Sequence, residues 1–193
     1  MKKFFTMAML GVMSISVLFT GSAEASVSEL SKGKIKEEFL KEQLLEKIKV
    51  DYPNAQFIDL TEEELQKQEE ANFGVRASAP PLRSLEVYAA ISTQHQTYEY
   101  FSPNQLSSVY DHGGDELYVV TEELGYGHIR YAKFNGVNLK QYMSEHIDLN
   151  GDSIVDGWYI WWDASGNDSG TFNYQNTSTN FPGNTMSDSI FIK

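Results

Sequence analysis

From residue 82 to residue 193 the sequence is a series of short β-type segments separated by clusters of turn residues. Residues 85–91 place Leu, Val, Ala and Ile at every second position, which is the period of a half-buried strand. Further strands are predicted over residues 116–122, 128–134, 158–162, 171–175 and 187–192. Short strands alternating with turns predict a mainly β fold, an antiparallel β-sandwich or barrel-like domain over residues 80–193.

Local signals predict how these segments are joined. The Gly-Tyr-Gly sequence at residues 125–127 predicts a turn that pairs its two flanking strands as a hairpin. Asn135-Gly136 predicts a second tight turn, because both residues tolerate a positive φ. Residues 102–110 open with a helix-capping signature and predict a short helix. Residues 139–146 carry side chains at helical spacing and predict another.

Residues 26–79 differ in kind from the β-domain. Residues 34–52 are dense in Lys, Glu and Leu and have one apolar stripe, which predicts an amphipathic helix. Thr61 and Glu64 form a capping box that predicts a second helix. Residues 73–81 predict a linker. This charged helical arm is either packed on the β-domain or a pro-region that a protease removes within the linker.

The first 25 residues have the three parts of a secretory signal peptide. Two lysines at the start precede an apolar stretch over residues 4–19. Ala23-Glu24-Ala25 then supplies the small-x-small pattern of a cleavage site, so the mature chain is expected to begin at Ser26. The protein is therefore predicted to be secreted and extracellular, and no later stretch is long and apolar enough to span a bilayer.

The net charge and the absence of cysteine narrow the range of possible ligands and chemistry. The formal net charge is −12, and residues 80–193 carry most of it, with five Lys and Arg against fourteen Asp and Glu. Such a chain repels phosphate backbones and anionic lipid surfaces, so nucleic acid and membranes are poor partners. Without cysteine, disulfides and thiolate chemistry are excluded. Cations, sugars and proteins remain as ligands.

Residues 148–156 have the spacing of a calcium-binding loop. Calcium takes six to eight oxygen ligands, which a tight loop supplies from alternate positions. Ser153 stands where such loops have Gly, and Tyr159 where they have a bidentate Glu, so the resemblance to an EF-hand or dockerin-type loop is partial. The alternative is a turn whose carboxylates accept backbone amides. The candidate metal ligands are Asp148, Asn150, Asp152, the Ile154 carbonyl and Asp156.

The three tryptophans follow this loop directly and form a second candidate site. Trp158 and Trp162 would share one face of a strand and Trp161 the other, so at least one ring is expected to face solvent. Exposed aromatic rings beside Asn and Asp are typical of sugar-binding surfaces. The alternative is that these rings anchor the core of a cysteine-free domain.

His112 is the candidate for catalysis. It lies in the sequence Asp111-His112-Gly113-Gly114-Asp115, where two carboxylates are available to orient it as a general base or as a metal ligand. The sequence contains no Gly-x-Ser-x-Gly nucleophile motif. The alternative is a histidine in a turn without a catalytic role.

Residues 111–122 (DHGGDELYVVTE), 134–139 (FNGVNL) and 169–172 (SGTF) carry a resemblance to a known family. Over residues 80–193 the chain resembles the YolA-like secreted proteins of Gram-positive bacteria, which have a domain of unknown function. The resemblance implies an extracellular protein, without implying an activity or site residues. The arm over residues 26–79 lies outside it.

These observations predict a secreted, non-enzymatic β-domain that binds a cell-surface or extracellular ligand, a glycan or a protein, with calcium stabilising the Asp148 loop. Two alternatives stay open. The first is a secreted hydrolase that uses residues 111–115. The second is a toxin-like or inhibitor-like protein held latent by residues 26–79.

Overall fold

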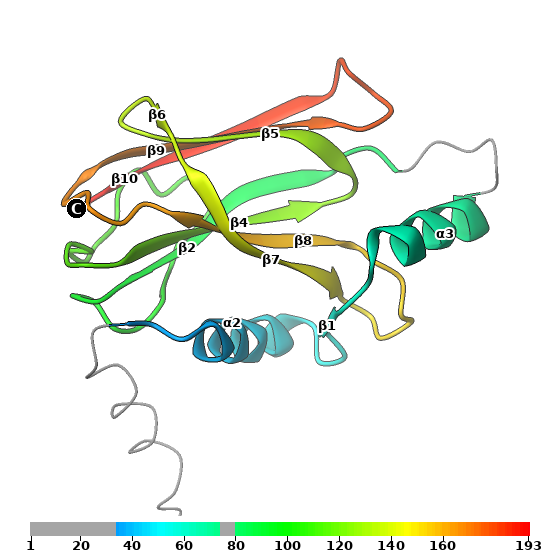
Figure 1. Cartoon of the computed structure of the whole chain (residues 1–193), viewed down its shortest axis with the longest axis horizontal. Helices are drawn as coiled ribbons and strands as arrows, with labels where there is room; N and C mark the ends of the chain where they lie inside the picture. The colour runs from blue at the N-terminus through cyan, green and yellow to red at the C-terminus, as the bar shows by residue number, and fades with distance from the viewer. Residues whose placement is uncertain (1–33, 74–79) are drawn as a thin grey trace, which may run out of the picture.

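The computed structural model describes residues 34–73 and 80–193. Its strands form two antiparallel sheets, and their side chains alternate between the inner and outer faces (Figure 1). The predicted β-sandwich is confirmed. The larger sheet has six strands in the order β1-β7-β8-β4-β2-β3. Its strands are β1 (Gln56–Ile58), β2 (Ser84–Ser92), β3 (Glu99–Tyr100), β4 (Leu117–Leu124), β7 (Lys140–Asp148) and β8 (Gly157–Asp163).

The smaller sheet has four strands in the order β10-β9-β5-β6. They are β5 (Gly127–Phe134), β6 (Val137–Asn138), β9 (Gly170–Ser178) and β10 (Thr185–Ile192). The facing surfaces of the two sheets enclose the main apolar core, in which Phe134, Phe172 and Ile192 meet Val119 and Ile160. The other surface of the smaller sheet faces solvent and carries mainly polar side chains, together with the exposed rings of Tyr131 and Phe191.

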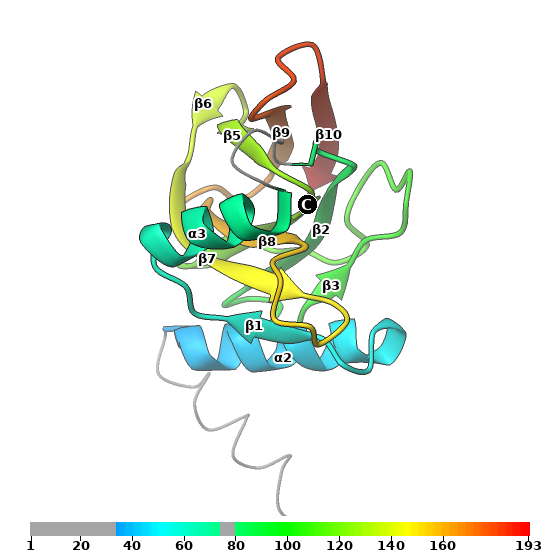
Figure 2. The ribbon, with the colours of Figure 1, turned by 90° about the vertical axis from the view of Figure 1, so that its right-hand side faces the viewer.

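Two helices precede the β-domain, at the positions that the sequence predicts. Helix α2 (Glu37–Asp51) lies along the larger sheet on the side away from the smaller one (Figures 1 and 2). Its apolar stripe, Leu40, Leu44 and Ile48, is buried in a second core against Ile91 and Trp161. The described part of the molecule therefore has three layers: helix, six-stranded sheet and four-stranded sheet.

Helix α3 (Glu62–Phe73) begins at the predicted capping box. The Thr61 hydroxyl accepts the Glu64 amide at 3.3 Å, and the Glu64 carboxylate accepts the Thr61 amide at 2.9 Å. Of the described helices, none is long and apolar enough to cross a membrane. The predicted signal peptide and residues 74–79 of the linker lie outside the described residues.

The predicted pairing of the strands that flank residues 125–127 is wrong. β4 and β5 belong to different sheets, and this turn carries the chain from one sheet to the other. Gly125, at a φ of 88°, donates its amide to the Asp156 carbonyl, and Tyr126 donates its amide to Pro80. The backbone groups are thus bonded to other segments, and β5 pairs with β9 instead. The second predicted turn, Asn135-Gly136, does join β5 and β6.

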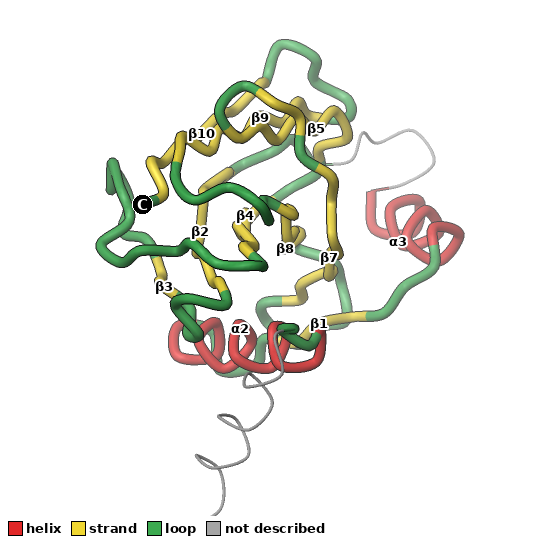
Figure 3. Tube along the Cα trace, turned by 60° about the vertical axis from the view of Figure 1, so that its left-hand side comes forward, coloured by secondary structure: helices red, strands yellow, loops and turns green. Residues whose placement is uncertain are grey.

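Both short helices predicted within the β-domain are also wrong. Residues 102–105 close a single turn, after which Leu106 and Ser108 exchange backbone hydrogen bonds with Phe191 of β10. The loop between β3 and β4 thus runs beside the end of β10, near the C-terminus (Figure 3). Residues 140–148 form strand β7, because β1 and β8 offer partners for its backbone on both sides.

Candidate functional site

The predicted calcium loop connects β7 to β8 and is held by its own hydrogen bonds. Asp148 is fully buried, and its carboxylate accepts the amides of Asn150, Gly151 and Ser153 at 3.1, 2.7 and 2.8 Å. The Gln56 side chain donates a fourth bond, at 2.9 Å. Burial alone raises the pKa of Asp148, but these hydrogen bonds outweigh it and hold the pKa below its usual value.

The other candidate ligands point to backbone amides as well. Asp152 accepts the Ile154 amide at 2.8 Å, Asn150 accepts the Asp152 amide at 2.9 Å, and Asp156 accepts the Leu149 amide at 2.9 Å. Across residues 34–73 and 80–193, no group of three or more His, Cys, Asp or Glu side chains is placed to hold a metal ion. The geometry is that of a turn built from carboxylates, and calcium at this loop stays a prediction.

All three tryptophans are buried, so the expected solvent-facing ring is wrong. The exposed fractions of Trp158, Trp161 and Trp162 are 8%, 0% and 5%. Strand β8 lies in the middle of the larger sheet, where the smaller sheet covers one face and α2 covers the other. The indole nitrogen of Trp161 donates to the Tyr98 hydroxyl at 2.6 Å, and that of Trp162 to the Thr121 hydroxyl at 2.9 Å. These rings anchor the two cores, the alternative that the sequence left open.

His112 is also buried, at the end of the loop that runs beside β10. Its Nε2 lies 2.9 Å from the carboxylate of Glu99, which is buried too. Its amide donates to the Lys193 carbonyl at 2.7 Å. The other ring nitrogen, Nδ1, is buried without a hydrogen-bond partner among the described residues. Because no face of this ring reaches solvent, a substrate has no access to it in this structure.

A buried ionic network between the sheets has no counterpart in the sequence predictions. The Glu123 carboxylate accepts Nε and Nη2 of Arg130 at 2.9 and 2.8 Å, and it also accepts the Tyr174 hydroxyl and the Asn176 amide. Arg130 lies over the Trp158 ring, 5.5 Å from its centroid. Four donors satisfy this carboxylate, which marks the network as structural. The sequence signal for this network was weak, because Glu123 follows Thr121 and Glu122 in the same strand.

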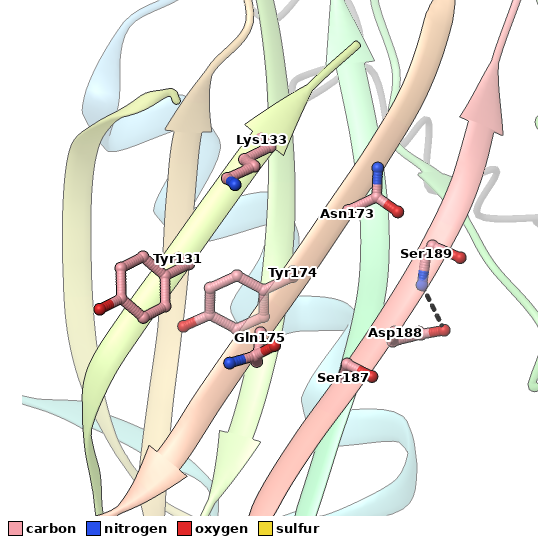
Figure 4. A pocket seen from close by; sticks show the side chains of 8 residues that line it. All are labelled: Tyr131, Lys133, Asn173, Tyr174, Gln175, Ser187, Asp188 and Ser189. Atoms are coloured by element: carbon pink, nitrogen blue, oxygen red, sulfur yellow. Dashed lines mark hydrogen bonds between the residues drawn. The ribbon is translucent and has the colours of Figure 1, made fainter. Parts of the chain in front are cut away.

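The outer face of the four-stranded sheet carries a hollow that is lined mostly by polar side chains (Figure 4). Tyr131 of β5 is in register with Gln175 of β9, which is in register with Ser187 of β10. The next row in the same direction is Lys133, Asn173 and Ser189. These six side chains, which we call the outer-face rows, line a hollow of about 580 Å³.

Several side chains of the outer-face rows have no partner among the described residues, whereas the Asn173 amide donates to the Thr171 carbonyl at 3.5 Å. Tyr131 is 52% exposed, and its hydroxyl makes no hydrogen bond to another described residue. Within the described chain, Gln175 and Lys133 likewise have no hydrogen-bonded or ionic side-chain partner. The nearby Asp188 differs, because it accepts the amides of Val87 and Ser189 at 2.7 Å. Period-two alternation within 128–134 and 171–175 is the signal from which this face could have been found.

Together these features define a class of protein, a two-sheet antiparallel β-sandwich with one open sheet face and with the opposite side covered by its own N-terminal helix. The chain belongs to the family Domain of unknown function (DUF4879), whose model matches residues 77–192. No curated protein and no solved structure matches it. The matched span contains both rows of the open face and leaves out α2, β1 and α3.

Proposed function

We propose that this protein is a secreted, non-enzymatic module that binds an extracellular glycan on the outer face of its four-stranded sheet. The observation that carries the proposal is the row of Tyr131, Gln175 and Ser187 across three strands. An exposed aromatic ring offers an apolar platform to a sugar ring, and the amide and hydroxyl beside it match sugar hydroxyl groups. Because the side chains stand on paired strands, the surface is organised before the ligand arrives.

The chemistry of the face favours a glycan over a protein partner. Asn173, Gln175, Ser187 and Ser189 make up most of the two rows. The centres of protein–protein interfaces are depleted in serine and lysine and enriched in large apolar anchors. The two rows instead gather amides and hydroxyls around one tyrosine, which provides donors and acceptors for a hydroxyl-rich ligand.

Other parts of the proposal rest on the sequence. Secretion rests on the signal-peptide pattern of residues 1–25 and on the resemblance to the YolA-like secreted proteins.

Binding without catalysis is supported by the burial of His112 against Glu99. Helix α2 does not block the proposed face, because it packs on the other sheet. Binding therefore requires no removal of α2.

The experiment is retention of the chain from residue 26 to 193 on insoluble cellulose, chitin, xylan and peptidoglycan sacculi. We expect at least one of these to retain the protein, and Tyr131→Ala to weaken retention by about tenfold through lost apolar contact. Gln175→Ala is expected to weaken it as well. Val137→Ala is the matched control, because this residue of β6 is 69% exposed and lines no part of the hollow. Retention unchanged in Tyr131→Ala would sink the proposal.

A further inference from the structure

We infer that the glycan is an uncharged, linear polysaccharide that lies diagonally across the outer face, from Tyr131 on β5 to Phe191 on β10. This inference rests on the proposed function and adds the length, direction and charge of the ligand. It depends on a second hollow beside the first and on the charges around both.

The two hollows lie end to end along β10. Ser187 and Ser189 border the first hollow, and Phe191 borders a second hollow of about 450 Å³. These three residues occupy alternate positions of one strand, so they share its outward face. Ile190 and Ile192, which face inward on the same strand, are buried. The other residues that line the second hollow are Gln94, Asp111, Gly113, Asp168, Ser169 and Lys193.

Two aromatic rings mark the ends of this surface. Tyr131 and Phe191 are 52% and 42% exposed. Tyr131 is in register with Gln175, and Gln175 with Ser187, which lies four residues before Phe191. From the spacing between strands and the rise along a strand, the two aromatic residues are roughly 17 Å apart. A single sugar cannot contact both rings, whereas several sugar units in line span the distance and pass over Asn173 and Ser189.

Charge disfavours a polyanion as the ligand. The residues that line the two hollows include two bases, Lys133 and Lys193, and three acids, Asp111, Asp168 and Asp188. The rest of the β-domain adds further negative charge, since residues 80–193 have five bases and fourteen acids. Such a surface repels repeated carboxylates or phosphates at ordinary ionic strength. Carboxylates accept hydrogen bonds from the hydroxyls of a neutral chain, and side-chain amides both accept and donate them, without this penalty.

The test is gel electrophoresis of the chain from residue 26 to 193 through matched soluble polysaccharides. Hydroxyethylcellulose and carboxymethylcellulose share a backbone and differ in charge, and xylan, β-glucan and galactomannan extend the neutral set. We expect a neutral polymer to retard the protein, and retardation to persist in high salt. Oligosaccharides of the retarding polymer are then titrated by calorimetry. Affinity should rise with chain length until both aromatic residues are covered.

Variants separate this inference from the proposed function. Phe191→Ala is expected to weaken the affinity for long oligosaccharides by roughly five- to tenfold and to leave the affinity for disaccharides unchanged. Val137→Ala should change neither. If Tyr131→Ala abolishes binding while Phe191→Ala and chain length have no effect, the diagonal path is wrong and the proposed function stands. If only carboxymethylcellulose retards the protein, and salt or Lys133→Gln abolishes this, the uncharged class is wrong. If Tyr131→Ala binds every polymer as the wild type does, both fail.

Discussion

The imidazole Nε2 of His112 lies 2.9 Å from the carboxylate of Glu99, and both side chains are buried. Burial alone raises the pKa of Glu99, but hydrogen bonds from the Val109 and Tyr110 amides and from His112 hold it below its usual value. Because an ionised carboxylate only accepts hydrogen bonds, Nε2 carries the proton. The pair fixes the loop between β3 and β4 beside the end of β10.

His112→Ala is therefore expected to destabilise the fold and leave glycan retention unchanged. Removing the ring leaves a buried carboxylate short of one donor, which costs about 1–3 kcal/mol of unfolding free energy. Urea denaturation measures this cost, with His128→Ala as the control because that histidine is exposed. A His112→Ala protein that keeps wild-type stability but loses hydrolysis of a wall or glycan extract would instead establish the hydrolase.

The stability of the protein is expected to fall between pH 4.5 and pH 6 through Glu122. This residue lies opposite Glu86 on the neighbouring strand and accepts the Tyr159 hydroxyl at 2.9 Å. Burial raises the pKa of Glu122 to about 6 from 4.5. The native state therefore holds the proton more tightly than the unfolded chain does. The resulting stability is fully present below pH 4.5 and is lost as pH rises through about 6.

Glu122→Gln tests this pH dependence. The neutral amide keeps an acceptor for the Tyr159 hydroxyl and has no proton to lose. We expect its unfolding free energy to exceed that of the wild type by about 2 kcal/mol at pH 7.5 and to match it near pH 4.5. Urea titrations at both pH values give the difference. An equal offset at the two pH values would show that the carboxyl does not titrate in this window.

The fold of the β-domain is expected to depend on the arm. Leu44 of α2 is fully buried in the core that contains Trp161 and Ile91. Hydroxyls of the sheet also bind the helix backbone, Tyr98 to Leu40 at 3.2 Å and Tyr100 to Gln43 at 3.1 Å. Leu44→Ala should cost about 2–5 kcal/mol of unfolding free energy, whereas Val50→Ala, on the exposed side of α2, should cost little.

Expression of residues 80–193 alone extends this test to the pro-region hypothesis. Without α2 the larger sheet exposes a contiguous apolar face, and such faces cause aggregation. We expect an aggregated or unfolded product by size-exclusion chromatography and circular dichroism. A stable monomer, together with secreted material that begins within residues 77–81, would show that the arm is a removable pro-region.

The sequence predicted the two helices of the arm, α2 and α3, and most strands, because each depends on local periodicity or on a cap such as Thr61 and Glu64. The prediction was wrong where the structure of a segment depends on a partner far away in the sequence. Residues 139–146 have helical spacing, yet the free edge of β8 makes them a strand. The strand over residues 158–162 was predicted, but its burial on both faces depends on the smaller sheet and on α2, which lies more than 100 positions earlier in the chain.

The candidate site was missed for the same reason. Tyr131, Gln175 and Ser187 each stand on a predicted strand, but only the order β10-β9-β5 and its register bring them into one row. Nothing local in the sequence specifies that order. The tryptophans and the Asp148 loop drew attention because their residue types are conspicuous, although the structure uses them for packing and for a turn.

The Asp148 loop is expected to be stable without a metal, because backbone amides already occupy its carboxylates. Asp148→Asn replaces an acceptor of four hydrogen bonds and should cost about 1–3 kcal/mol of unfolding free energy in the presence of a chelator.

Calcium bound at this loop would add to the metal-free stability of the protein. An ion held only by the native state raises its stability by about 2.7 kcal/mol at a hundred times the dissociation constant. Thermal unfolding of the wild type and Asp152→Ala, with calcium and with chelator, separates the two contributions. A calcium-dependent rise that Asp152→Ala abolishes makes the loop a metal site as well as a turn. If the midpoint is the same with calcium and with chelator while Asp148→Asn keeps its cost, the carboxylates serve the backbone alone.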